Sequence, residues 1–208
     1  MQNYSQRVRE SILPLSVGET LPNAFEEWSV TDRIIDHGAP NETCQLCGKD
    51  ELRYHFEILN VFTGGKLWVG SHCILKFGLS VFENGQALSP AAAKKKIHRL
   101  MEQVRQQSCI RALEALAASE SNDILYNALR YFRTHKFLSP KHASVVLWQL
   151  EKHQIDHNPS FFKINLKHAR FKEQLEGMEG WRIRLLWPAL TSSQREVARR
   201  YGHIPPAL

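Results

Sequence analysis

The sequence predicts an α+β protein, mostly α, in which a small metal-binding module with a β-hairpin precedes a helical bundle. Three observations predict it. Cys44 and Cys47 form a close pair with Cys73 further along, the segment between them alternates as strands do, and the chain is helical in pattern from Ser89 onward. We therefore divide the chain into residues 1–88, with the module at about 43–78, and a helical domain at 89–208.

Composition indicates a folded chain outside the membrane. The 208 residues are 43% hydrophobic, which is enough for one core or for a small metal-stabilised module beside a helical one. No stretch approaches the ~18 uncharged apolar residues of a membrane span, and the first residues, MQNYSQRVRES, lack the apolar region of a secretory signal. We expect a cytoplasmic protein with no membrane partner.

The four cysteines fall into two groups. Disulfides are rare in a reducing compartment, so Cys44, Cys47 and Cys73 are better explained as metal ligands. Cys109 stands alone in a helical pattern, and we expect it to be a small buried apolar residue.

The module's secondary structure follows from its alternation. Residues 52–60, LRYHFEILN, and 66–70, KLWVG, alternate around the turn FTGG and predict a β-hairpin. Ser71 is the expected N-cap of a short helix that ends at Gly78. Residues 27–36 predict a hairpin or a passage from helix to strand.

The cysteine spacing predicts a treble-clef-like zinc finger with zinc as the cofactor. A Cys-x-x-Cys-Gly turn, a hairpin and Cys73 at a helix start follow one another along the chain. This combination would bring three thiolates around one tetrahedral metal ion. The sequence leaves the fourth ligand open: we rank His72 first, His55 second and His37 third. Three thiolates weaken a Lewis acid, so we expect a structural zinc.

Helices are predicted in the second domain, with hydroxyl N-caps at Ser89, Ser139 and Thr191. No strand is expected after residue 80. The predicted helices span residues 90–118, 122–134, 140–152, 161–175 and 191–201.

The charge distribution indicates a polyanionic partner. Residues 1–88 hold 7 Lys+Arg against 11 Asp+Glu, a net charge of -4, whereas residues 89–208 hold 20 against 10, a net charge of +10. An excess of this size on one part is typical of nucleic-acid binding, and solvated helix faces are the alternative.

Candidate contacts to nucleic acid lie in two places. Basic residues at a helix start oppose the macrodipole, which suggests phosphate contact for those that begin the first long helix. Lys66 and Trp68 lie on the hairpin, where Trp68 could stack on a base or pack in the core. The candidates in the helix are Lys94, Lys95, Lys96 and Arg99.

Residues 43–77, TCQLCGKDELRYHFEILNVFTGGKLWVGSHCILKF, resemble a zinc finger of bacterial phage, plasmid and other mobile-element proteins, which share CxLCG, an aromatic strand and VGSxCI. A finger followed by a small basic helical domain is similar in plan to the large subunit of type IV CRISPR effector complexes. That resemblance implies a non-enzymatic subunit, with companion subunits, that contacts the crRNA 5′ end and recognises a PAM on duplex DNA. It matches only Cys44, Cys47 and Cys73 as ligands.

Four functions stay open at this point. The first is a zinc-containing nucleic-acid-binding subunit of a ribonucleoprotein assembly that binds RNA, duplex DNA or both and is not an enzyme. The others are a free-standing phage or plasmid DNA-binding protein, a metal-dependent nuclease, and a scaffold whose basic helices bind an acidic protein. The ββα-metal nucleases also use treble clefs, but DHGAP precedes the cysteine pair here and their His and Asn positions cannot be matched.

Overall fold

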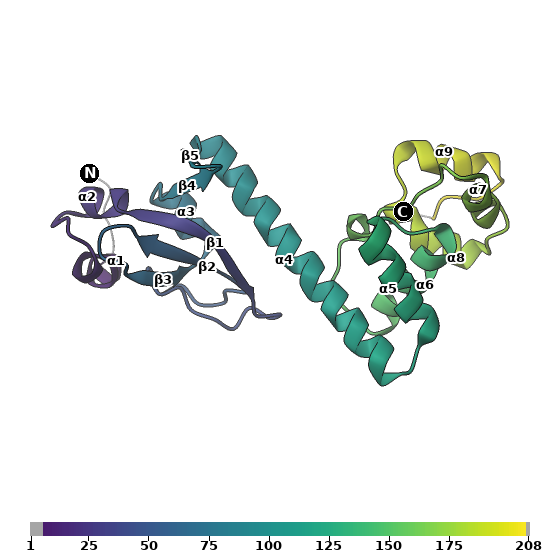
Figure 1. The fold of residues 1–208 in the computed structure, drawn as a ribbon, viewed down its shortest axis with the longest axis horizontal. Coiled ribbons are helices and arrows are strands. Elements are labelled where there is room, and N and C mark those ends of the chain that lie inside the picture. The colour runs from purple at the N-terminus through teal and green to yellow at the C-terminus, as the bar shows by residue number, and fades with distance from the viewer. Residues whose placement is uncertain (1–5, 207–208) are drawn as a thin grey trace. The chain divides into compact units, whose positions relative to one another are not determined.

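The computed structural model describes residues 6–206 and divides after Arg105 into two compact units. We name residues 6–105 the sheet unit and residues 106–206 the helical unit. Helix α4, Pro90–Ser119, begins in the first unit and ends in the second (Figure 1). The predicted α+β class is confirmed.

The sheet unit holds a five-stranded sheet in the order β3-β2-β1-β4-β5. Strand β2 pairs antiparallel with both β1 and β3, and β1 pairs in parallel with β4. The strands are β1, Trp28–Asp36; β2, Tyr54–Asn60; β3, Lys66–Val69; β4, Ser80–Glu83; and β5, Gln86–Ala87. The helices are α1, Gln6–Ile12; η1, Leu13–Leu15; α2, Leu21–Glu26; and α3, Ser71–Lys76.

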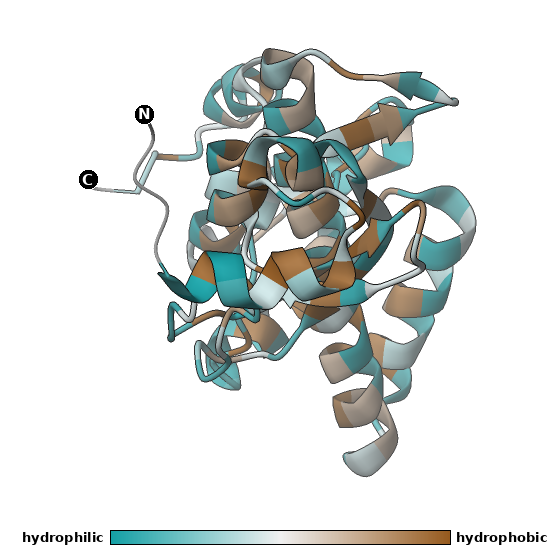
Figure 2. Cartoon of the chain, turned by 90° about the vertical axis from the view of Figure 1, so that its left-hand side faces the viewer, coloured by the Kyte–Doolittle hydropathy of each residue, from teal (hydrophilic) through white to brown (hydrophobic). Residues whose placement is uncertain are grey.

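Alternation along the strands directs one face of this sheet into the hydrophobic core. Phe56 and Ile58 of β2 and Val69 of β3 lie in the core with Trp28, whereas the residues between them point to the opposite face. Figure 2 shows hydrophobic and hydrophilic residues interleaved along the helices and strands of the chain. The predicted hairpin is therefore confirmed. Within the predicted range 27–36, Glu27 is the C-cap of α2 and residues 28–36 form one strand, which corresponds to the predicted passage from helix to strand.

The prediction that no strand follows residue 80 is wrong, because β4 and β5 lie there. Strands β4 and β5 form a tight hairpin around Asn84 and Gly85, whose φ angles are 52° and 78°. An Asn-Gly pair is the strongest short signal for such a turn.

The helical part was predicted to begin at residue 89, whereas the sheet unit extends to Arg105. Ala93 and Ile97 on the first turns of α4 pack in the core of the sheet unit, with Met101 against it. The charge distribution changes accordingly. Residues 1–105 hold 12 Lys+Arg against 12 Asp+Glu, a net charge of zero, and residues 106–208 hold 15 against 9, a net charge of +6.

The helical unit packs its helices around a second core that includes Leu113, Leu125 and Leu147. Asn122, Ser139 and Thr191 cap their helices with side-chain hydrogen bonds, and Cys109 is buried as expected. The helices are α5, Asp123–His135; α6, Pro140–Lys152; η2, Pro159–Phe161; α7, Ala169–Glu176; α8, Gly180–Leu186; η3, Trp187–Ala189; and α9, Ser192–Arg200.

The predicted helix at 161–175 is wrong in its first half. Phe162, Ile164 and Leu166 are buried, the residues between them are exposed or half-buried, and Ile164 forms a parallel bridge with Leu138. This segment is extended, so its apolar period is two rather than 3.6. Helix α8 was not predicted because its start, Gly180, resembled part of a polar connection.

Candidate metal centre

The three cysteines of the predicted finger meet in the sheet unit. The Sγ atoms of Cys44, Cys47 and Cys73 all lie within 4.8 Å of one another, and no other cluster of this kind occurs among residues 6–206. The Sγ atoms of Cys44 and Cys73 are 3.7 Å apart, far beyond a disulfide bond length of about 2 Å. All three thiols are free.

A tight turn places the first two thiols. The N–H of Gly48 donates to the carbonyl of Cys44 (2.8 Å), and the N–H of Cys44 donates to the carbonyl of Lys49 (2.9 Å). Gly48 has φ +73°, and a Cβ there would meet the Arg7 side chain at 2.5 Å. This position therefore favours glycine for its backbone angle, whereas the Arg7 side chain could move aside for a Cβ.

Two further contacts hold the turn beside the third thiol. The N–H of Gln45 donates to the carbonyl of Trp68 (3.0 Å), and the N–H of Trp68 donates to Oε1 of Gln45 (2.7 Å). Strand β3 then leads through Gly70, the N-cap of α3, to Cys73 in the first turn of that helix. The predicted cap, Ser71, is instead the first helical residue.

The surroundings of the thiols favour a thiolate. The pKa of Cys44 is lowered to about 5, mainly by a hydrogen bond from Cys73, with burial acting in the opposite direction and the backbone N–H groups of Cys47, Gly70 and Leu46 adding to the lowering. The same contact and burial raise the pKa of Cys73. Amides directed at sulfur are a usual feature of thiolate metal sites.

The cluster fits a metal ion by its ligand chemistry and its spacing. A tetrahedral ion with metal–sulfur bonds of about 2.3 Å separates its sulfur ligands by about 3.8 Å. The distance of 3.7 Å between the Sγ atoms of Cys44 and Cys73 agrees with that value, so these two side chains need not move to bind the ion. We conclude that Cys44, Cys47 and Cys73 could together hold a metal ion.

The three candidate histidines for the fourth ligand lie in different places. His72 is exposed and lines the same cavity of about 170 Å³ as the three cysteines, although it is not within the 4.8 Å cluster. His55 pairs with Ile35 of β1, and its ring lies 5.0 Å from His37 and 6.5 Å from Trp68. Neither His55 nor His37 lines that cavity.

The strand register places His55 outside the cysteine cluster. The β2–β3 register ends with Phe56 opposite Val69, and the alternation turns His55 to the face away from the core. Sequence reasoning also missed Met101, which reaches this cavity from α4. Its i, i+4 spacing from Ile97 was the available signal.

The basic residues at the start of α4 are of two kinds. Lys94 and Lys95 are exposed. Lys96 is only 8% exposed, since its Nζ lies 2.8 Å from Oδ1 of Asp32 and also donates to the carbonyl of Phe82. Arg99 forms an ion pair with Glu83. Lys96 and Arg99 therefore hold α4 against the sheet, and the burial of Lys96 removes that residue from the candidate phosphate contacts.

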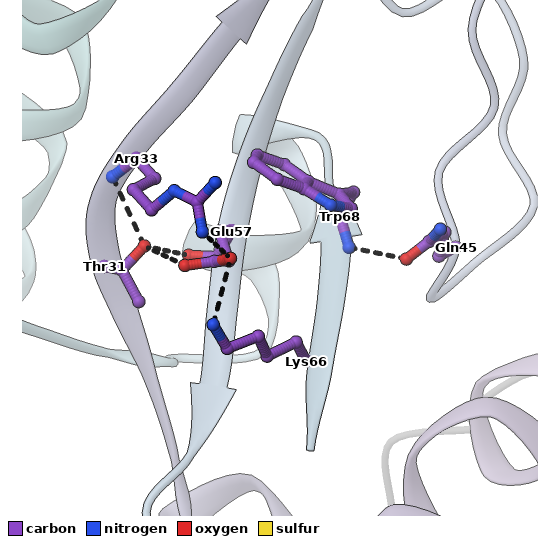
Figure 3. A network of polar contacts seen from close by, with 6 residues as sticks. All are labelled: Thr31, Arg33, Gln45, Glu57, Lys66 and Trp68. Atoms are coloured by element: carbon purple, nitrogen blue, oxygen red, sulfur yellow. Dashed lines mark hydrogen bonds and ion pairs between the residues drawn. The ribbon is translucent and has the colours of Figure 1, made fainter. Parts of the chain in front are cut away.

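Lys66 and Trp68 lie together on the outer face of the sheet. Nζ of Lys66 is 3.5 Å from Oε1 of Glu57, and Trp68 is half-buried beside it (Figure 3). Trp68 is thus absent from the buried core of the unit.

No family model, curated protein or solved structure matches this chain. Among residues 6–206, no helix has both the length and the apolar composition that crossing a membrane requires.

Proposed function

We propose that this chain is a non-enzymatic, zinc-containing nucleic-acid-binding subunit of a ribonucleoprotein assembly. The observation that carries the proposal is the unpaired positive charge of the helical unit. The metal centre and an exposed apolar surface support the remaining parts of it.

Four of the 15 Lys and Arg residues in the helical unit form ion pairs with carboxylates, which leaves eleven without such a partner within the described residues. All of these except Arg195 are exposed. Unpaired exposed cations can neutralise phosphates and release their counterions. The eleven residues without a carboxylate partner are Arg111, Arg130, Lys136, Lys141, Lys163, Lys167, Arg170, Lys172, Arg184, Arg195 and Arg200.

Zinc is the metal that three thiolates at tetrahedral spacing suit best, since soft anionic sulfur and a closed site are typical of structural zinc. His72 is the proposed fourth ligand because it is the only one of the three candidate histidines that lines the cysteine cavity. Zinc held by Cys44, Cys47 and Cys73 would cross-link the turn to α3.

His72→Ala is expected to weaken zinc retention more than His55→Ala does, because His72 alone of the two borders the cysteine cavity. A chelator competition followed by metal analysis measures the difference. Metal loss in the His55 variant with full retention in the His72 variant contradicts this ligand assignment.

An apolar surface of the helical unit supports membership of an assembly. Ile124, Tyr126, Trp148 and Trp181 are between 41% and 65% exposed, and three of them, Ile124, Trp148 and Trp181, line one cavity of about 250 Å³. Large apolar side chains gathered on a surface mark protein contacts, and tryptophan dominates such interfaces. We assign this surface to a companion subunit.

The resemblance to type IV CRISPR large subunits makes this proposal more specific. In that case the chain contacts the crRNA 5′ end and recognises a PAM on duplex DNA, while guide pairing reads the target sequence. The combination of a cysteine cluster with an unpaired basic helical unit is compatible with that role. We assign no residue to the PAM.

Purification without nuclease from cells that express the neighbouring genes tests the assembly. The chain is expected to elute with RNA and with companion subunits, and ribonuclease should reduce the size of the complex. Elution of the chain by itself, free of RNA under low salt, contradicts membership of a ribonucleoprotein.

A further inference from the structure

The outer face of the sheet unit carries a group of polar and aromatic side chains on three adjacent strands. Arg33 lies on β1, Glu57 on β2, and Lys66 and Trp68 on β3. We name these four residues the outer platform. The register places Glu57 directly opposite Trp68, with the core residues Phe56 and Ile58 facing the other side.

Glu57 organises the cations of the outer platform. Its side chain is only 4% exposed, and its Oε1 accepts from Nη1 of Arg33 at 2.9 Å and lies 3.5 Å from Nζ of Lys66. The hydroxyl of Thr31 donates to Oε2 at 3.0 Å. Figure 3 shows Arg33 and Lys66 reaching Glu57 from the strands on either side. A nearly buried carboxylate thus holds two cations at the surface.

Those two cations keep most of their exposure. The side chains of Arg33 and Lys66 are 67% and 52% exposed although both contact Glu57. Two positive charges face one negative charge, so the outer platform carries a net charge of +1. Its donors stay accessible to an anion from solvent.

Trp68 supplies an aromatic ring beside Arg33 (Figure 3). The guanidinium of Arg33 lies 5.8 Å from the centre of its ring, and the ring is half-buried. The hydrogen bonds that its backbone makes with Gln45 fix its strand at the sheet edge. Because the backbone of Trp68 is fixed and its ring packs beside Arg33, a base that stacks on the ring costs little further conformational entropy of this side chain.

We propose that the outer platform binds single-stranded nucleic acid, with one base stacked on Trp68 and the adjoining phosphate held by Arg33 and Lys66. This proposal rests on the proposed function and names the ligand class of a second surface, distinct from the basic helical unit. Aromatic residues flanked by cations on a sheet bind single strands because unpaired bases expose their faces. In a duplex those faces are covered by neighbouring base pairs.

Substitution of Trp68 separates stacking from charge. Trp68→Leu is expected to weaken binding of a short single-stranded oligonucleotide about tenfold, with the salt dependence unchanged, because a stacked base contributes that order of affinity without releasing counterions. Trp68→Phe keeps a ring and should retain most of the affinity. Duplex binding, metal content and the unfolding midpoint should be unchanged in both variants.

Arg33→Gln provides a test that does not depend on the aromatic side chain. Each lost phosphate contact should lower the slope of log binding constant against log salt by about 0.7 for a single strand. RNA and DNA oligonucleotides of one sequence, measured in parallel, show whether the 2′-hydroxyl contributes to binding here.

The outcomes distinguish this proposal from the proposed function. Unchanged single-strand affinity in Trp68→Leu, in a chain that still binds nucleic acid through its helical unit, overturns the outer platform alone. A chain that binds neither single strands nor duplexes overturns both proposals. Loss of single-strand affinity in Trp68→Leu and a lowered salt slope in Arg33→Gln, with duplex binding intact, support it.

Discussion

Cys47→Ser is expected to release the metal and unfold the sheet unit while the helical unit keeps its structure. Cys44 and Cys73 lie in the core of the sheet unit, and Cys47 packs against it. Without metal, the thiolates are brought together with no compensating ligation, and structural metal sites of this kind supply folding free energy directly. The helical unit has its own core and no residue in the cysteine cluster.

Cys109→Ala is the matched control, since it removes a buried cysteine that lies outside the cluster. Metal analysis should find about one equivalent in the wild type and in this control, and almost none in Cys47→Ser. Hydrogen exchange should show loss of protection throughout the sheet unit, including β2 and α3, with the helical unit unchanged. Less than half an equivalent in wild-type protein purified without chelator contradicts the metal centre.

Reversal of three cations in the helical unit is expected to reduce nucleic-acid affinity about a hundredfold, because several phosphate contacts are lost together. Lys163→Glu, Lys167→Glu and Arg170→Glu change exposed residues that have no carboxylate partner within the described residues. The loss should be similar for different sequences, since phosphate contacts carry no sequence information. Fluorescence anisotropy with two unrelated duplexes measures it.

A control with the same change in net charge shows whether the position of the charges matters. Arg133, Lys152 and Arg199 already contact Glu114, Glu120 and Glu196. Their combined reversal to Glu should lower affinity less than the first set. Equal losses from the two sets indicate a response to net charge alone, and no loss from either removes the electrostatic argument and favours a protein-binding scaffold.

Local patterns predicted the cysteine cluster and most of the helices. Cys-x-x-Cys fixes two ligands within one turn, and the hairpin signal brings Cys73 back to them, so short-range chemistry determined the meeting of residues 29 positions apart. The caps at Ser139 and Thr191 were equally local. Such elements depend on few neighbours, which is why sequence predicts them.

Long-range packing decided what the sequence left open. Lys96 has the same charge as its neighbours Lys94 and Lys95, but only the position of α4 against β4 makes it a buried partner of Asp32. The outer platform likewise depends on the register of three strands, which places Glu57 opposite Trp68. Neither the Lys96–Asp32 contact nor the position of Glu57 opposite Trp68 can be predicted from residue types alone.

The salt dependence of binding tests the central claim most directly. The affinity of the wild-type chain for a duplex should fall steeply as salt rises from about 50 to 200 mM, with a loss on the order of a thousandfold if several phosphates are neutralised. This follows from the eleven cations of the helical unit that have no carboxylate partner within the described residues. An affinity that stays constant across that range contradicts nucleic-acid binding by this unit.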